Sequence, residues 1–276
     1  MSHEEAIKER WQSFLQHPRV ITFRRRFAPQ LAFLQARFSP EIYLGLNLTV
    51  GLIILVGAGW LFGGIAEDVV NSDPLTTVDL HVANLLHARA TPTLNFGMQL
   101  VSYFGGTLFV SVLTVAAAAW LIWQRHWFRL VELVLIVPGG MLVNVLLKHA
   151  FQRARPAFDN PILTLTTYSF PSGHAAAAML LYGAFAVFAA WKLRTWSGKL
   201  LLGVFAVMVI ALIDFSRIYL GVHYLSDVLA GSAAGIAWLA LCITAVETMR
   251  RRRLALLEGK QSADKSSASS TTEENL

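Results

Sequence analysis

The chain has 276 residues, of which 55% are hydrophobic and only 14% are charged. Soluble domains carry about 25% charged residues, so this composition excludes intrinsic disorder and argues against a water-soluble globule. The net charge of +6 keeps a nucleic-acid partner under consideration until the charges are placed. The polar, acidic start predicts no cleavable signal peptide, and the one cysteine, Cys242, cannot form a disulfide within the chain. We therefore expect an integral membrane protein.

Six apolar stretches are long enough to cross a bilayer, for which a helix needs about 20 residues. They are residues 43–64, 97–123, 130–148, 171–191, 200–217 and 224–246. The pairs Gly105–Gly106 and Gly139–Gly140 within them are interpreted as packing or kink positions. The predicted fold class is all-α, a polytopic membrane protein with six transmembrane helices.

The distribution of Lys and Arg predicts how these helices are oriented. The two tails and the loops at 124–129 and 192–199 hold 18 of the 23 Lys and Arg residues. Because such residues concentrate on the cytoplasmic side, both termini are predicted to be cytoplasmic. Segments 65–95, 149–170 and 218–223 then face the outside. The charges follow membrane topology, so a nucleic-acid partner loses its support.

Three regions follow from this topology. They are a cytoplasmic basic segment at 1–41, a six-helix membrane domain at 42–248 and a cytoplasmic tail at 249–276, basic and then disordered. Segment 1–41 fits either an amphipathic helix on anionic lipid headgroups or a plain positive-inside anchor. Residues 76–90 repeat apolar positions at helical spacing, which predicts a short interfacial helix on the outer face.

Ionisable side chains gather at the outer ends of four predicted helices. Lys148 ends the third helix and is followed by Arg155, His174 opens the fourth, Arg217 ends the fifth, and His223 and Asp227 begin the sixth. Charged groups at the edge of a membrane are costly, so their convergence marks a candidate functional site.

The cations and the start of the fourth helix form a candidate anion site. Lys148 and Arg155 are seven residues apart, on nearly one face if the helix continues to Pro156. With Arg217 they suit phosphate, although snorkelling to lipid headgroups is the alternative for the first two. Ser172 is a candidate N-cap and Gly173 permits close backbone approach, so this helix start can bind an anion. An ordinary cap is the alternative.

His223 and Asp227 lie four residues apart, on one face of a helix. A carboxylate at this spacing holds an imidazole in one tautomer, which is typical of a histidine nucleophile or base. Half of a metal site is another interpretation, but the sequence offers no Cys or further acidic cluster to support zinc. Asp214, three residues before Arg217, is interpreted as the ion-pair partner of that arginine.

Three motifs together resemble the type 2 phosphatidic acid phosphatase family, which shares its site with class A acid phosphatases and vanadium haloperoxidases. The family pattern is Lys-x6-Arg-Pro, then Pro-Ser-Gly-His, then Ser-Arg-x5-His-x3-Asp. The chain matches it at every motif position with KHAFQRARP (148–156), PSGH (171–174) and SRIYLGVHYLSD (216–227).

The resemblance implies an enzyme, a membrane lipid phosphatase that needs no metal or other cofactor. His223 would attack phosphorus to give a phosphohistidine, Asp227 would orient it, and His174 would protonate the leaving oxygen. The phosphoryl oxygens would be held by Lys148, Arg155, Ser172, Gly173 and Arg217. With both histidines near an unperturbed pKa of ~6.5, we predict a bell-shaped pH–rate curve centred near neutrality.

The expected substrates are undecaprenyl pyrophosphate, phosphatidic acid or phosphatidylglycerol phosphate, each entering sideways from the bilayer. The expected location is a bacterial inner membrane, with the active site facing the periplasm or exterior. A lipid phosphotransferase using the same site is the nearest alternative. A transporter of anions or lipids is the alternative from another class.

Overall fold

The computed structural model describes residues 27–28 and 46–273, with the side chains of the last helix described as far as Leu257. The chain divides into two units, residues 1–50 and 51–276. The segment at 1–41, with its predicted amphipathic helix, lies outside the described residues apart from 27–28. All contacts discussed below belong to the second unit.

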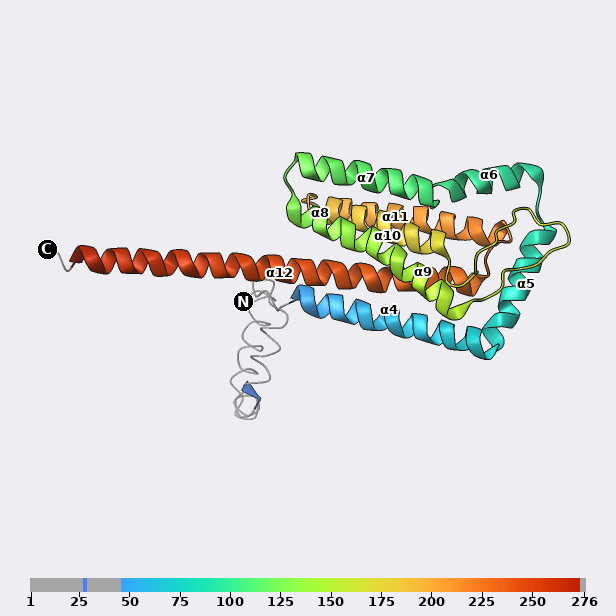
Figure 1. Ribbon diagram of the computed structural model, residues 1–276, viewed down its shortest axis with the longest axis horizontal. Helices are drawn as coiled ribbons and strands as arrows, with labels where there is room; N and C mark the ends of the chain where they lie inside the picture. The colour runs from blue at the N-terminus through green and yellow to red at the C-terminus, as the bar shows by residue number, and fades with distance from the viewer. Residues whose placement is uncertain (1–26, 29–45, 274–276) are drawn as a thin grey trace, which may run out of the picture. The chain divides into compact units, whose positions relative to one another are not determined.

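The described chain is a series of helices (Figure 1). They are α4 (Leu46–Asn71), α5 (Pro74–Ala88), α6 (Pro92–Tyr103), α7 (Thr107–Trp123), α8 (Trp127–Val134), the π-helix η1 (Leu135–Gly139), α9 (Gly140–Phe151), α10 (Gly173–Ala190), α11 (Trp196–Tyr219) and α12 (Leu225–Glu273). Within these described residues, six helical segments are long and apolar enough to cross a membrane. The predicted fold class is confirmed, and α5 confirms the helix predicted near 76–90.

Local sequence accounts for the breaks between and within these segments. The second span consists of α6 and α7, separated at the Gly105–Gly106 pair, as the sequence predicts. In the third span Pro138 lacks a backbone N–H, and the helix widens into η1 around it. The indole nitrogen of Trp238 donates to the Leu135 carbonyl at 2.8 Å, so this part of the distorted helix keeps a hydrogen-bonding partner.

Two predicted helix ends differ from the structure. The third span ends at Phe151, because Gln152 adopts a left-handed conformation with φ of 48°. Arg155 therefore lies beyond the helix, and its predicted position on one helical face with Lys148 is wrong. The last helix continues to Glu273, although the tail was predicted to be disordered. The residues that follow the span predicted from the sequence, 249–258, are largely strong helix formers and include no proline to end the helix.

The helix α10 packs against α9, α11 and α12. Its first turns carry the run Ala175–Ala178, whose side chains are all buried. On α12, Gly231 faces this run so closely that a Cβ there would lie 2.6 Å from the Ser172 carbonyl oxygen. Small residues on both helices allow their backbones to approach, as is typical of packing between membrane helices.

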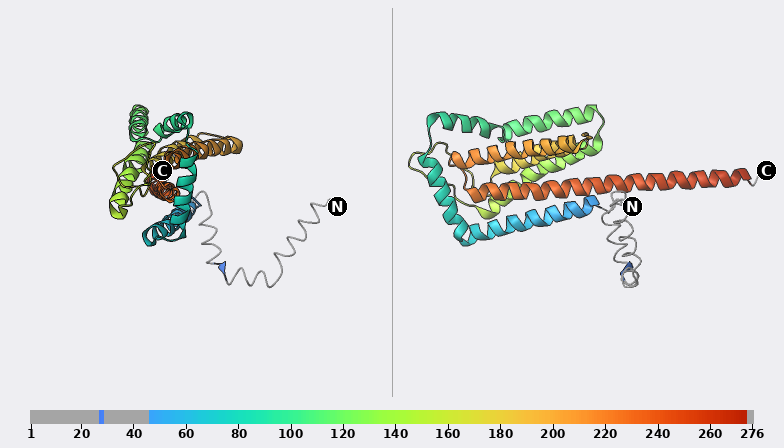
Figure 2. Two further views of the ribbon diagram at one scale, coloured as in Figure 1. Left: turned by 90° about the vertical axis from the view of Figure 1, so that its right-hand side faces the viewer. Right: turned by 180° about the vertical axis from the view of Figure 1, so that it is seen from behind.

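Figures 1 and 2 show α5 lying across one end of the helix bundle, beside the loop that joins α9 to α10. We call this end the α5 end. The opposite end, where α7 meets α8 and α10 meets α11, carries Trp120, Trp123, Trp127, Trp191 and Trp196. We call it the tryptophan end.

Candidate active site

The helix ends and turns that carry the site residues predicted from the sequence lie at the α5 end (Figure 1). Helix ends and the adjoining turns place them there: Lys148 in the last turn of α9, Arg155 in the following loop, Ser172 as the N-cap of α10, Gly173 and His174 in its first turn, Arg217 in the last turn of α11, His223 in the next turn and Asp227 in the first turn of α12. The turn before His223 uses Gly221, whose φ of 68° favours glycine.

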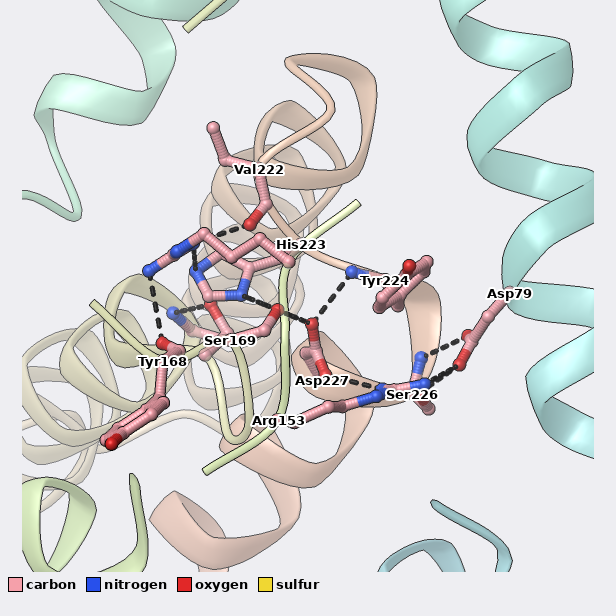
Figure 3. A network of polar contacts seen from close by, with 12 residues as sticks. Asp79, Arg153, Tyr168, Ser169, Val222, His223, Tyr224, Ser226 and Asp227 are labelled. Carbon is pink, nitrogen blue, oxygen red and sulfur yellow. Dashed lines mark hydrogen bonds and ion pairs between the residues drawn. The ribbon is translucent and has the colours of Figure 1, made fainter. Parts of the chain in front are cut away.

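His223 is bound on both ring nitrogens, as Figure 3 shows. Its Nδ1 lies 3.4 Å from Asp227 Oδ2 and 3.4 Å from Ser169 Oγ, and its Nε2 lies 3.1 Å from Arg155 Nη1. A guanidinium can only donate, so Nε2 must accept and Nδ1 carries the proton towards Asp227. The Nε2 lone pair is then directed away from the carboxylate, which is the tautomer that a nucleophilic imidazole needs.

The protonation of His223 follows from its burial. The side chain is 2% exposed, and loss of water lowers its pKa to about 4, although the Asp227 carboxylate raises it in opposition. The cations Arg155 and Arg217 lower the pKa further. The assumption of an unperturbed pKa is therefore wrong for His223, which is neutral at physiological pH.

Asp227 is fully buried and surrounded by donors. Its Oδ2 accepts hydrogen bonds from the Ser169 hydroxyl and, at 2.8 Å, from the Tyr224 backbone N–H. Its Oδ1 accepts from Arg153 Nη1 at 2.6 Å. A carboxylate that receives several hydrogen bonds is favoured in its charged form and fixed in orientation.

Arg153 joins Asp227 to a second buried carboxylate (Figure 3). Its Nη2 donates to Asp79 Oδ2 at 2.8 Å, and its guanidinium carbon lies 4.4 Å from the centre of the Tyr224 ring. Asp79 comes from α5 and also accepts hydrogen bonds from the N–H and hydroxyl of Ser226. The two carboxylates raise the pKa of Arg153 in opposition to its burial, so this guanidinium stays charged.

Three residues of this network, Asp79, Arg153 and Ser169, were not predicted from the sequence. Arg153 lies inside the first motif but at one of its unspecified positions, and Ser169 lies just before the second. Asp79 is the one acidic residue of α5, and its lack of exposure is visible only in the structure. An acidic residue on a helix predicted to be interfacial was the available signal.

The three predicted phosphate-binding cations, Lys148, Arg155 and Arg217, lie around His223 and Asp227. Lys148 Nζ donates to the Tyr168 carbonyl at 2.7 Å, and Arg155 donates to the Thr167 carbonyl at 2.7 Å and the Val222 carbonyl at 2.5 Å. Both cations thus bind the segment just before the Pro-Ser-Gly-His motif, rather than extending away towards headgroups. Burial lowers the pKa of Arg155, and Asp227 opposes that effect.

Arg217 is 3% exposed and donates from Nη1 to Ser102 Oγ on α6 at 2.5 Å. Its buried Nε has no hydrogen-bonding partner among the described residues. The predicted ion pair with Asp214 is wrong, because that carboxylate accepts from Ser232 on α12 at 2.7 Å. A buried guanidinium N–H without an acceptor is costly, which favours an anion as its partner.

The start of α10 has the geometry predicted for it. Ser172 Oγ accepts from the Ala175 N–H at 3.4 Å, and the Ser172 N–H donates to the Asp227 carbonyl at 2.8 Å. The cap therefore also connects α10 to the first turn of α12. His174 packs against the Gly105–Gly106 turn, near enough to Arg217 and His223 to interact with them electrostatically.

In the part of the chain that the structure describes, no group of three His, Cys, Asp or Glu side chains is arranged to hold a metal ion. Apart from the carboxylates Asp79 and Asp227, which are bound by other side chains, the residues gathered at the α5 end are cations, hydroxyls and two histidines, a set that suits a phosphoryl group.

Comparisons with known proteins agree with this chemistry. Residues 129–251 match the model of the PAP2 superfamily, a range that contains all three motifs. The phosphatidylglycerophosphatase B of Bacillus subtilis is 29% identical over 178 residues, covering 64% of this chain and 87% of the relative. An undecaprenyl-diphosphatase of Sulfolobus acidocaldarius is 27% identical over 175 residues, covering 62% and 79%.

A solved structure is also similar. It is a transmembrane PAP2 type phosphatidylglycerolphosphate phosphatase from Bacillus subtilis, with a TM-score of 0.62 and 28% sequence identity. The match covers 68% of this chain and 93% of the solved one. The resemblance noted in the sequence is thereby confirmed.

Proposed function

We propose that this chain is a membrane lipid phosphatase of the PAP2 superfamily, as its family match and its relatives support, and that it acts through a phosphohistidine on His223. The observation that carries the proposal is the pair of contacts on the imidazole. Asp227 lies at Nδ1 and a donor, Arg155, lies at Nε2, so the lone pair of Nε2 is free for attack once Arg155 turns to the substrate.

In the first step Nε2 attacks phosphorus, and the bond from phosphorus to the leaving oxygen breaks. His174, protonated, gives its proton to that oxygen, and the dephosphorylated lipid departs. In the second step neutral His174 takes a proton from water, whose oxygen attacks phosphorus. The phosphorus–nitrogen bond breaks, inorganic phosphate leaves and both histidines return to their starting states.

The cations stabilise the charge that spreads over the transferring phosphoryl group. Lys148, Arg155 and Arg217 converge on this position, and the unpartnered Nε of Arg217 supports its assignment to a phosphoryl oxygen. The N-cap Ser172 and the N–H of Gly173 add the positive end of α10. With so much fixed positive charge, we propose that no metal is required.

Arg153 and Asp79 are positioning residues in this proposal. Arg153 holds Asp227 from one side while Ser169 and Tyr224 hold it from the other. Asp79 in turn fixes Arg153 and the backbone of Ser226. Neither needs to touch the substrate, because both act on the orientation of Asp227 and, through it, on His223.

We propose a lipid phosphate or pyrophosphate as the substrate, with phosphatidylglycerol phosphate, undecaprenyl pyrophosphate and phosphatidic acid as candidates. The names of the relatives support the first two. The site lies at the ends of membrane-spanning helices, the depth at which a lipid presents its headgroup. We further propose a bacterial inner membrane with both termini in the cytoplasm, which places the α5 end outside.

The test is release of inorganic phosphate by purified protein in detergent, with EDTA present and these three lipids as substrates. We expect release by the wild type and none above background by His223→Ala, together with a ³²P-labelled acid-labile adduct in the wild type alone. Equal release by the variant would overturn the assignment of His223. Phosphate transfer only when an acceptor lipid is added would identify a phosphotransferase, and loss of activity with EDTA would contradict metal independence.

A further inference from the structure

A cavity of about 400 Å³ lies at the tryptophan end, between α7, α8 and α10. This volume is in the range of ligand-binding pockets. Its walls are apolar and largely aromatic, and three basic side chains complete its lining: Ala117, Trp120, Leu121, Leu133, Phe185, Phe188, Ala189 and Trp191, with His126, Arg129 and Lys192. The cavity is separated from the proposed active site by the length of α10, whose 18 residues span roughly 27 Å.

The surrounding tryptophans indicate the depth of this cavity in a bilayer. Of the eight tryptophans in the chain, the five that define the tryptophan end lie where helices end and turn. They are well exposed, from 43% for Trp191 to 84% for Trp196. Exposed tryptophans concentrate at the boundary between acyl chains and headgroups, so the cavity lies at headgroup depth.

The basic residues of the cavity are held by its aromatic walls. The guanidinium carbon of Arg129 lies 3.5 Å from the centre of the Trp191 ring, and the ammonium of Lys192 lies 4.9 Å from the Trp120 ring. Such stacking fixes a cation without occupying its N–H groups. Arg129 donates from Nη1 to Glu132 at 2.7 Å, and Lys192 has no carboxylate partner among the described residues. Donors therefore remain for an anion.

Lys199 provides the comparison for an ordinary interfacial lysine. Its ammonium stacks on Trp196 at 5.4 Å, which resembles the arrangement of Lys192 on Trp120. Neither Lys199 nor Trp196 lines the cavity. A lysine that only extends towards the interface needs no apolar chamber beside it, whereas a bound lipid needs both a cation and a place for its acyl chain.

We propose that this cavity binds one anionic phospholipid from the leaflet that it faces. The lipid phosphate contacts Arg129, Lys192 and His126, and part of an acyl chain fills the space between Phe185, Phe188 and Trp191. Charge complementarity favours an anionic over a zwitterionic headgroup, because the lining brings the cations Arg129 and Lys192 together and contains no carboxylate. The proposal does not rest on the phosphatase chemistry at the other end of the bundle.

The experiment is native mass spectrometry of the detergent-purified full chain, titrated with dioleoyl-phosphatidylglycerol or dioleoyl-phosphatidylcholine. We expect tighter binding of the first phosphatidylglycerol than of phosphatidylcholine. Lys192→Gln should weaken phosphatidylglycerol binding about fivefold, the scale of one interfacial lysine, and leave phosphatidylcholine binding unchanged. Lys199→Gln, the matched control, should bind both lipids as the wild type does.

A second variant distinguishes lipid binding inside the cavity from lipid binding to the basic side chains at the surface. Ala189→Leu adds bulk to the lining and keeps every basic residue, so it should reduce the binding of phosphatidylglycerol. Equal binding of the two lipids by the wild type would overturn the proposal, as would an equal loss in Lys192→Gln and Lys199→Gln. Unchanged binding in Ala189→Leu would place the lipid elsewhere and overturn it too.

Discussion

The two ends of the helix bundle hold their arginines in different ways. At the α5 end, Arg153 lies between two fully buried carboxylates, Asp79 and Asp227, each more than 70 residues away in the chain. At the tryptophan end, Arg129 pairs with Glu132 three residues along its own helix and lies over Trp191. The first arrangement is assembled by the tertiary fold, and the second is mostly local.

This difference corresponds to the role that we propose for each end. Phosphoryl transfer needs cations and a nucleophile fixed in a site with little water, because charge–charge interactions are then strong and need no rearrangement. A headgroup site at the membrane boundary needs only positive charge beside an apolar surface. We therefore expect small changes at the α5 end to affect catalysis strongly, and similar changes at the tryptophan end to leave it unaffected.

The largest effect is expected for Asp227→Asn. The amide keeps the shape of the carboxylate but can donate to Nδ1, which favours the wrong tautomer of His223. We expect kcat to fall on the order of 10⁴-fold with little change in KM, the scale seen when a catalytic imidazole is held in the wrong tautomer. Steady-state kinetics with the preferred lipid will measure this. A loss below tenfold would contradict the role given to Asp227.

The next largest effect is expected for Gly231→Ala, because a Cβ there would lie 2.6 Å from the Ser172 carbonyl and 3.1 Å from the Ala175 Cβ. Overpacking at α10 should cost about 1–3 kcal/mol of stability and displace the phosphate-binding turn. A small displacement can lower kcat by up to about 10²-fold. Thermal unfolding and kinetics are the measurements.

Gly203→Ala on α11 is the matched control for that variant, since a Cβ there would meet no atom within 4 Å. It should leave kcat unchanged and raise stability slightly, because alanine favours helix over glycine. If both alanine variants behave alike, close approach between α10 and α12 is not what positions the turn.

A smaller effect is expected for Asp79→Asn, which removes one charge that binds Arg153. We expect kcat to fall about tenfold with KM unchanged, the scale of a hydrogen bond to a charged group. Asp73→Asn, at the N-cap of the same helix and without a side-chain capping bond, should have no effect. A positioning role also predicts a lower pKa for His223 in Asp79→Asn, because a negative charge near the imidazole is lost. Equal pH profiles would indicate a purely structural role.

The smallest expected effect is on the pH dependence of the wild type. In the proposed mechanism neutral His223 is the nucleophile, so the acid side of the kcat/KM profile should fall as the pH drops through about 4, the pKa to which burial lowers it, while loss of the His174 proton limits the alkaline side. A fall of kcat/KM near pH 6.5 would contradict this expectation, because it would mean that the imidazole of His223 is exposed to water and not buried. Lys199→Gln should leave the whole profile unchanged, since it lies at the tryptophan end.

Much of this architecture follows from local sequence. The number of spans could be predicted because a bilayer of given thickness requires apolar runs of given length, and each run is continuous in the sequence. The predicted site residues could be found because each motif lies next to a helix end. The end of α9 could not be predicted, because no clear sequence signal marks Gln152 as left-handed. Arg155 was therefore predicted to lie on a helix, whereas it lies in the loop that follows.

From local sequence, then, we could predict the six spans, the resemblance to a family and the set of residues that meet at one end of the bundle. The tertiary structure alone decided how they act on one another: that Arg155 meets His223, that Ser172 is tied to Asp227, and that α5 supplies Asp79. Hydrophobicity and local propensity act on neighbouring residues and can be read along the chain. A buried carboxylate instead needs a cation from wherever the fold can bring one, and its partner is determined by packing in three dimensions.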